Sequence, residues 1–423
     1  MTEHLELNTS NGATLPRGVQ KLLNWFLFFL AFPSLIVVDN SVTFYIFIVI
    51  VYKVGIYWVR PFKGKILFFS FLFVVVASTF LGLFHDMERH PGFFYTIQII
   101  VQYTYWILLA AFMIIFRGRI DLLQLSKWLF FGTIASIVGF YLVPFKLDLA
   151  VVTIITNSTR NSFIFSLLCT IPLSFLYLRY KYTKIKIFYF ILFFGVTVLF
   201  TNGRSGAVII LVQLFLIASI IYPVFRRIMN ISILPLVFMF FLIQSDGMQV
   251  YLNGIASQVE SINPRFANLL RAEGDGDLTI DKSWLIRKLM IDKGFEIIEQ
   301  YPFLGIGANN FKYFDSELAT YEGYERLGYL STSLFNSRSA HNSYVQILAE
   351  FGIIGFIFFI LILLQPILFL FRKIFTNKLS IYDLPLISLI GLCLHFYAIA
   401  SITGAIPWFI FGLCWSISNK IKR

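Results

Sequence analysis

The sequence predicts an all-α protein that crosses a membrane about twelve times. The chain has 423 residues, of which 58% are hydrophobic and only 13% are charged. Apolar runs of about 20 residues, the length that a helix needs to cross a bilayer, recur along the whole chain. A membrane β-barrel would instead show short segments of alternating polarity. The composition therefore excludes an ordinary soluble domain and indicates a polytopic helical membrane protein.

Each predicted span is an apolar run bounded by polar or charged residues. The spans cover about 22–38, 41–58, 66–84, 94–116, 127–145, 161–178, 185–201, 206–222, 230–244, 343–371, 383–398 and 403–418. Most connections between them are short. The exception is 245–342, which is predicted as a large external loop between the ninth and tenth spans, and a connection that long usually has a function.

Lysine and arginine are unevenly distributed among the connections. With the N-terminus inside, the inner segments hold 21 of the 34 basic residues and four acidic ones, a net charge of +17. The outer segments hold the other 13 basic and 18 acidic residues, a net charge of −5. Cytoplasmic loops carry the excess of basic residues, so both termini are predicted in the cytoplasm. The overall charge of +12 is then an orientation signal, and no nucleic-acid partner is expected.

The hairpin between the seventh and eighth spans lies on the outer side. It contains Asn202, Gly203, Arg204 and Ser205, with Gly206 following. The glycines let the backbone turn tightly, and the next helix offers its free N–H groups and positive dipole end to the outer interface. Arg204 adds a bidentate donor suited to phosphate. The alternative is an arginine that extends to the lipid headgroups.

The tenth span begins on the same side of the membrane, at His341. Asn342 or Ser343 can cap the helix that starts there. A histidine in this position can titrate near neutral pH and act as a general base. The alternative is a polar residue at a membrane interface. His395 lies inside a span and is predicted to be a packed, hydrogen-bonded histidine.

The external loop contains local order. Residues 282–300 are predicted as an amphipathic helix with Trp284, Ile291, Phe295 and Ile298 on one face. A Tyr-Pro pair ends this helix, and a glycine-rich turn follows. Arg287 lies on the helix and could rest over the membrane surface, or it could be an ordinary solvated arginine.

Two acidic stretches have the residue types of a metal site without its spacing. His85 and His90 share a short outer loop with Asp86 and Glu88. Another stretch of the external loop alternates oxygen-bearing side chains as a calcium loop does, but Ile280 stands where the tight turn needs glycine. We therefore expect no metal and no cofactor.

Three segments, taken in order, resemble the O-antigen ligase and polymerase superfamily of bacterial membrane glycosyltransferases. They are Thr-Asn-Gly-Arg-Ser-Gly at 201–206, Tyr-Pro-Phe-Leu-Gly-Ile-Gly-Ala-Asn-Asn-Phe at 301–311, and His341-Asn342 followed by Gly-Ile-Ile-Gly at 352–355. The family also places a large external loop between late spans. The resemblance implies a GT-C-like membrane fold.

The resemblance covers about 185–360 and suggests a division of the chain into three parts. The first, 1–184, would hold the N-terminal transmembrane helices, and the last, 361–423, the C-terminal ones. Between them, 185–360 would form the ligase- or polymerase-like core, with the external loop at 245–342.

The family's functional residues carry over to this sequence one at a time. The hairpin arginine resembles Arg204, the histidine after the loop resembles His341, and the loop arginine falls best on Arg287, with Arg271 and Arg338 as competitors. The resemblance implies that His341 accepts a proton and that the two arginines stabilise a diphosphate. Further substrate-binding residues are expected around them: Asn202, Gly203, Ser205, Arg338, Asn342, Ser343 and Tyr344.

The implied reaction moves a glycan from undecaprenyl diphosphate to an acceptor sugar hydroxyl on the periplasmic side of the bacterial inner membrane. The resemblance implies inversion at the anomeric carbon, and the arginines make a metal unnecessary. A polymerase would extend a lipid-linked chain, and a ligase would transfer the chain to lipid A–core. We favour the polymerase, because an outer face of net charge −5 would repel a phosphorylated lipid A–core.

A polysaccharide flippase is the alternative from a different class of protein. Transporters usually carry charged residues in the middle of their spans, whereas the spans of this chain hold almost none. Many also show internal symmetry, which this sequence lacks.

Overall fold

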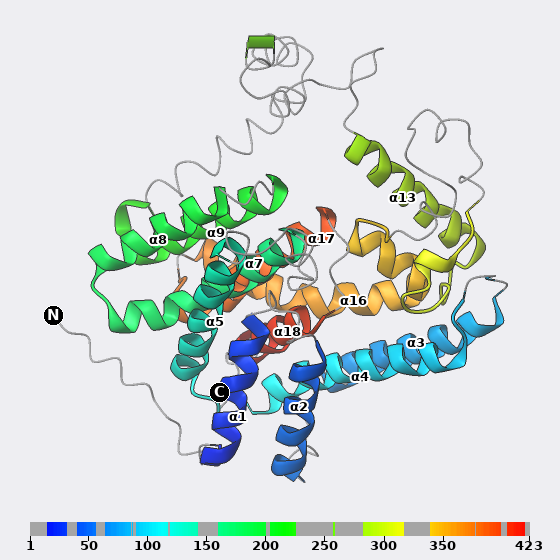
Figure 1. Cartoon of the computed structure of the whole chain (residues 1–423), viewed down its shortest axis with the longest axis horizontal. Helices are drawn as coiled ribbons and strands as arrows, with labels where there is room; N and C mark the ends of the chain where they lie inside the picture. Colours follow the sequence, from blue (N-terminus) through cyan, green and yellow to red (C-terminus); the bar gives the residue numbers. More distant parts are fainter. Residues whose placement is uncertain are drawn as a thin grey trace.

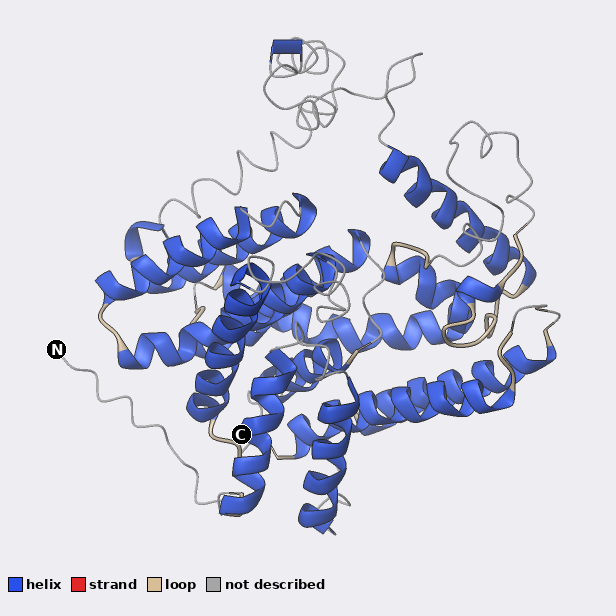
Figure 2. Ribbon diagram, in the orientation of Figure 1, coloured by secondary structure: helices blue, strands red, loops and turns tan. Residues whose placement is uncertain are grey.

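The computed structural model describes residues 15–31, 40–55, 64–85, 87, 90–116, 119–142, 160–199, 204–225, 257–258, 282–316, 339–376, 378–398 and 404–418. These residues are almost entirely helical and include no strand (Figure 2). The first helices are α1 (Arg17–Ala31), α2 (Asn40–Val54), α3 (Lys65–Leu81), η3 (Gly82–Phe84), α4 (Phe93–Ile115), α5 (Leu122–Leu142), α7 (Arg160–Lys181), α8 (Lys184–Leu199) and α9 (Arg204–Ile221). The later ones are α13 (Lys282–Gln300), η5 (Phe311–Tyr313), α16 (Ser343–Phe375), η7 (Ile381–Asp383), α17 (Leu384–Ala398) and α18 (Ala405–Ser418).

Among the described residues, five helices are long and apolar enough to cross a membrane. They are Lys65–Phe84, Phe93–Ile115, Leu122–Tyr141, Phe163–Lys181 and Ser343–Phe375. Shorter apolar helices occur at Val42–Val54, Gly206–Ile221, Ile381–Tyr397 and Ala405–Ser418. Each predicted span overlaps a helix, apart from 230–244, which lies outside the described residues. The all-helical membrane fold is confirmed, whereas the count of about twelve spans stays a prediction.

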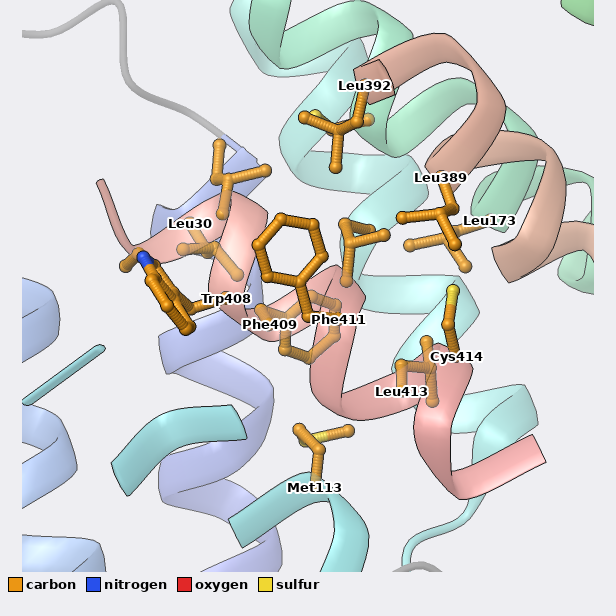
Figure 3. Close-up of a cluster of buried hydrophobic side chains, with 14 of the residues drawn as sticks. Leu30, Met113, Leu173, Leu389, Leu392, Trp408, Phe409, Phe411, Leu413 and Cys414 are labelled. Carbon is orange, nitrogen blue, oxygen red and sulfur yellow. The ribbon is translucent and has the colours of Figure 1, made fainter. Parts of the chain in front are cut away.

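The α18 helix lies at the centre of the helical bundle (Figure 1). It packs against α4, α16 and α17, and its residues are buried without interruption from Ala405 to Ser416. Figure 3 shows its aromatic side chains meeting residues of α1, α4, α7 and α17. A helix that is apolar on every face suits such a position. Gly412 brings α4 very close, since a Cβ there would lie 2.4 Å from the Ala110 carbonyl oxygen.

Polar side chains join α7, α9 and α17 inside this apolar bundle. Gln213 of α9 donates from Nε2 to the carbonyl oxygens of Leu168 at 2.9 Å and Ile387 at 3.0 Å. Ser388 of α17 donates to the Cys169 carbonyl oxygen at 2.8 Å. Hydrogen bonds between helices hold them in register where lipid offers no alternative partner. The middle of α9 is therefore fixed relative to α7 and α17.

Candidate active site

The α16 helix begins with a defined cap. The Asn342 side-chain oxygen accepts hydrogen bonds from the backbone N–H groups of Tyr344 at 2.9 Å and Val345 at 3.2 Å. Of the two predicted capping residues, the structure therefore selects Asn342. His341 comes immediately before the cap, half-buried and with a φ of 52°. That left-handed conformation is uncommon for a residue with a side chain and marks a constrained turn.

The α16 helix is not continuous. Gly352 has φ 62° and ψ −171°, and the helix kinks there. The kink frees the carbonyl groups of Ala349 and Glu350 and the N–H groups of Ile353 and Ile354 from the regular helical pattern. Backbone groups freed inside a membrane protein need new partners.

The segment after α13 supplies those partners. Ile306 N–H donates to the Ala349 carbonyl at 3.1 Å, and Gly307 N–H donates to the Glu350 carbonyl at 2.8 Å. In the other direction, the carbonyls of residues 302 and 303 accept from the two N–H groups beyond the kink, at 2.8 and 3.3 Å. The two sequence segments at 301–311 and 341–355 thus form one structural unit.

Glycine is required where these two segments meet. A Cβ on Gly305 would lie 2.4 Å from the backbone carbon of Glu350, and one on Gly352 would lie 2.2 Å from that of Phe303. Both glycines also have a positive φ, of 65° and 62°. The close approach and the left-handed backbone together explain these motif glycines.

The α13 helix has the predicted bounds, but its buried face differs from the predicted one. Phe295 is 51% exposed. The buried residues are Met290, Lys293, Gly294 and Ile297. The reason is the glycine, whose missing side chain lets Val345 of α16 approach to within 2.2 Å of where a Cβ would lie. The Lys293 ammonium lies 5.3 Å from the centroid of the Phe311 ring, which compensates for part of its burial.

Arg287 continues the buried face of α13 toward the start of α16. It is half-buried and stands three residues before Met290 and seven before Gly294, at helical spacing. The chain after α13 bonds to residues farther along α16, so the two helices run in the same direction. Arg287 is roughly 10 Å before the contact of Gly294 with Val345, and His341 is about 6 Å before it on α16. Both residues therefore lie toward the same end of the helix pair.

The start of α9 lies at that same end of the bundle. A Cβ on Gly206 would lie 2.1 Å from Ile164, near the start of α7. The next α7 residue, Phe165, stacks on His395 of α17 with ring centroids 5.4 Å apart. Two residues earlier on α17, the Cys393 carbonyl accepts a 2.9 Å hydrogen bond from the Tyr344 hydroxyl, on the first turn of α16. These contacts connect the helix starts that carry Arg204 and His341.

Several predicted site residues lie partly or wholly outside the part of the chain that the structure describes. Arg204 and Ser205 begin α9, but their side chains are outside the described part of the chain. Four predicted residues are outside it altogether: Asn202, Gly203, Arg271 and Arg338. Ser343 is described, and it is buried at the first position of α16.

His395 is packed as predicted but lacks the predicted hydrogen bond. The side chain is 1% exposed, and neither ring nitrogen has a hydrogen-bond partner. The stacking on Phe165 accounts for its packing. An orphaned histidine this close to the start of α16 is one feature that the sequence did not reveal.

Glu350 is a second polar residue that the sequence reasoning overlooked. It is 1% exposed. Its Oε1 atom accepts a 2.9 Å hydrogen bond from Gln346, whereas Oε2 has no partner of good geometry. The backbone N–H groups of Asn309 and Phe311 face this carboxyl group. The available signal was an acidic residue inside an apolar helix, which is rare without a role.

The two histidines of the α3–α4 connection pack against the segment after α13. His85 lies 4.2 Å from the Tyr301 ring, and burial lowers the pKa of its imidazole. Burial also lowers the pKa of His90, although the neighbouring Asn310 side chain opposes the shift. Burial therefore favours the neutral form of both imidazoles. Within the described residues, no group of three or more His, Cys, Asp or Glu side chains could hold a metal.

Comparison with known proteins adds one match. Residues 188–360 match the family model described as O-antigen ligase. No curated protein matches the chain significantly. The matched residues include α9, α13, the glycine-rich segment and the kinked part of α16. The family recognised from the three motifs is confirmed over this region, and together with the apolar helices the match identifies an integral membrane protein.

Proposed function

Because residues 188–360 match the O-antigen ligase family, we propose that this protein transfers a glycan from undecaprenyl diphosphate to an acceptor sugar hydroxyl. The observation that carries the proposal is the convergence of α9, α13 and α16 at one end of the bundle. Two of these helices, α9 and α16, begin there, where the positive end of the helix dipole stabilises anionic groups. The site would face the periplasm from the inner membrane.

In the proposed reaction, the acceptor hydroxyl oxygen attacks the anomeric carbon of the donor sugar. The bond from that carbon to the diphosphate oxygen breaks, and the lipid diphosphate leaves with the bonding electrons. His341 accepts the proton of the attacking hydroxyl. Arg204 and Arg287 stabilise the charge that develops on the leaving diphosphate. Attack from the face opposite the leaving group would invert the anomeric carbon.

Joining repeat units is the activity we favour, with transfer to lipid A–core as the alternative. The argument is the net charge of −5 predicted for the outer segments, which disfavours a phosphorylated acceptor. The matching family is described as O-antigen ligase, which supports the ligase reaction as the alternative. Both reactions use the same donor and would use the same three residues.

A reconstituted assay separates these activities. The purified full chain in lipid nanodiscs would receive an undecaprenyl diphosphate-linked repeat unit, with or without lipid A–core. Longer lipid-linked products without the second acceptor would support the polymerase. Sugar appearing only on lipid A–core would support the ligase. The absence of both products from correctly folded protein would contradict the proposed function.

A further inference from the structure

A group of aromatic and polar side chains lies at the outer ends of α3 and α4. We call it the outer aromatic cluster and define it as His90, Tyr95, Asn309, Lys312 and Tyr313. The residues come from the α3–α4 connection, the first turn of α4 and the segment around η5. Figure 1 shows this segment lying against the joined ends of α3 and α4, next to the first part of α16.

The rings of the outer aromatic cluster meet edge to face. Ring centroids of Tyr95 and Tyr313 are 5.7 Å apart, and the His90 ring is 6.2 and 6.0 Å from them. The Lys312 ammonium lies 4.9 Å from the Tyr313 centroid and 5.5 Å from that of Tyr95. Asn309 donates a hydrogen bond to the Tyr95 hydroxyl. All five side chains are half-buried, so each keeps some surface exposed to solvent.

The backbone beneath the cluster is held by several independent contacts. Asn310 donates to the Ile306 carbonyl at 2.8 Å, and Ala308 N–H donates to the Thr79 hydroxyl at 3.2 Å. Glu350 lies below, facing the N–H groups of residues 309 and 311. Asn309 itself has a left-handed φ of 59°. A surface fixed in this way loses little conformational entropy when it binds a ligand.

Tyrosine at a membrane interface often serves only as an anchor to the headgroup region. The start of α4 also carries aromatic residues suited to such an anchoring role. Phe93 and Phe94 are 56% and 88% exposed and carry no polar group. Tyr95 and Tyr313 instead pack on each other and on a buried polypeptide segment, and they are interleaved with donors and acceptors. That combination fits a ligand with both apolar and hydroxyl-bearing surfaces.

We infer that the outer aromatic cluster is a binding site for the acceptor glycan, at sugar units some distance from the reacting hydroxyl. Aromatic rings provide rigid contact area for the apolar faces of sugar rings. Lys312, Asn309 and the tyrosine hydroxyls provide hydrogen bonds to sugar hydroxyl or carboxylate groups. The inference rests on the proposed glycan transfer for the identity of the ligand.

The position relative to His341 supports the acceptor as the occupant. Glu350, beneath the cluster, is nine residues after His341 along the first part of α16, a rise of roughly 13 Å. A short oligosaccharide can span that distance. The glycan whose hydroxyl loses its proton to His341 can thus extend along α16 and reach the cluster.

The test compares Tyr313→Ala and Lys312→Ala with the control Phe94→Ala. The purified full chain in nanodiscs would receive acceptor glycans of increasing length. We expect each cluster variant to raise the KM for long acceptors by about tenfold, the effect of losing a sizeable contact. An acceptor too short to reach the cluster should show no such change, and the control should match the wild type with every acceptor.

Direct binding gives a readout that does not depend on catalysis. The delipidated repeat-unit oligosaccharide would be the probe, and saturation-transfer NMR the measurement. Loss of binding in the cluster variants but not in the control would support the site. Equal binding by all proteins, or equal KM values for long acceptors, would overturn it. A wild type that binds the probe without transferring sugar would contradict the proposed function alone. If Tyr313→Ala does not fold, the results for Lys312→Ala test the binding site by the same criteria.

Discussion

The helices α16 and α18 are neighbours of similar hydrophobicity with opposite construction. The α18 helix is continuous, and most of its buried residues meet other helices through apolar side chains, although Trp415 also donates a hydrogen bond to the Ile362 carbonyl of α16 at 2.7 Å. The α16 helix breaks at Gly352, and the segment after α13 completes its hydrogen bonds. A continuous helix satisfies its own backbone, whereas a broken one needs a second segment to do so. The break therefore couples the segment after α13 to the helix that begins just after His341.

The largest effect is expected from a substitution just before the start of α16. We expect His341→Ala to lower glycan transfer on the order of 10²–10⁴-fold, because the acceptor hydroxyl loses its base. Glycan ladders from a strain lacking the native gene would measure the effect. Expression and membrane insertion should remain at the wild-type level. Near-normal ladders would exclude His341 as the base.

The kink itself gives the second prediction. Gly352→Ala places a side chain where φ is 62° and where Phe303 leaves no space. We expect a loss of stability of about 2 kcal/mol or more, from backbone strain and the overlap with Phe303. The melting temperature measured in nanodiscs and the transfer rate should both fall.

A glycine in a regular helix provides the matched control for the kink. A Cβ on Gly195 of α8 would find its nearest neighbour at 3.8 Å, an ordinary contact. Gly195→Ala should therefore leave the melting temperature unchanged or raise it slightly. If the two substitutions had equal effects, the loop segment would not depend on the conformation of Gly352.

The sequence predicted the elements of this region better than their contacts. The bounds of α13 follow from local signals, namely its apolar periodicity and the Tyr-Pro pair at its end. The cap at Asn342 is local as well. The buried face of α13 is not local, because it depends on Gly294 admitting Val345 from another helix.

The residues of the candidate site divide in the same way, into those that local sequence signals predict and those that depend on contacts between distant segments. His341 and Arg204 stood out because each begins a helix on the predicted outer side. The buried surroundings of Glu350 and the orphaned His395 became visible only when distant segments were brought together. The kink at Gly352 also escaped prediction, since a glycine inside an apolar run is compatible with a continuous helix. Its conformation depends on residues 302–307, which are about 50 positions earlier in the sequence.

A substitution in the hairpin before α9 tests the chemistry of the site rather than the fold, and its expected effect is smaller. Arg204→Lys keeps the positive charge but loses the planar group that can hold two phosphate oxygens. We expect transfer to fall by on the order of tenfold, less than for loss of the base. The donor titration in the nanodisc assay would measure it. Full activity of the lysine variant would limit Arg204 to a general electrostatic role.

The smallest expected effect is that of metal removal. Two arginines and two helix N-termini can stabilise a diphosphate without a cation. We therefore expect the purified protein to transfer glycan at an unchanged rate in excess chelator. The control adds magnesium, manganese or calcium back to the treated protein. A complete loss of transfer that one of these ions restores would contradict the metal-free mechanism. It would direct attention to Asp275, Asp277 and Asp281 of the predicted external loop, whose carboxylates are the type of ligand that such ions prefer.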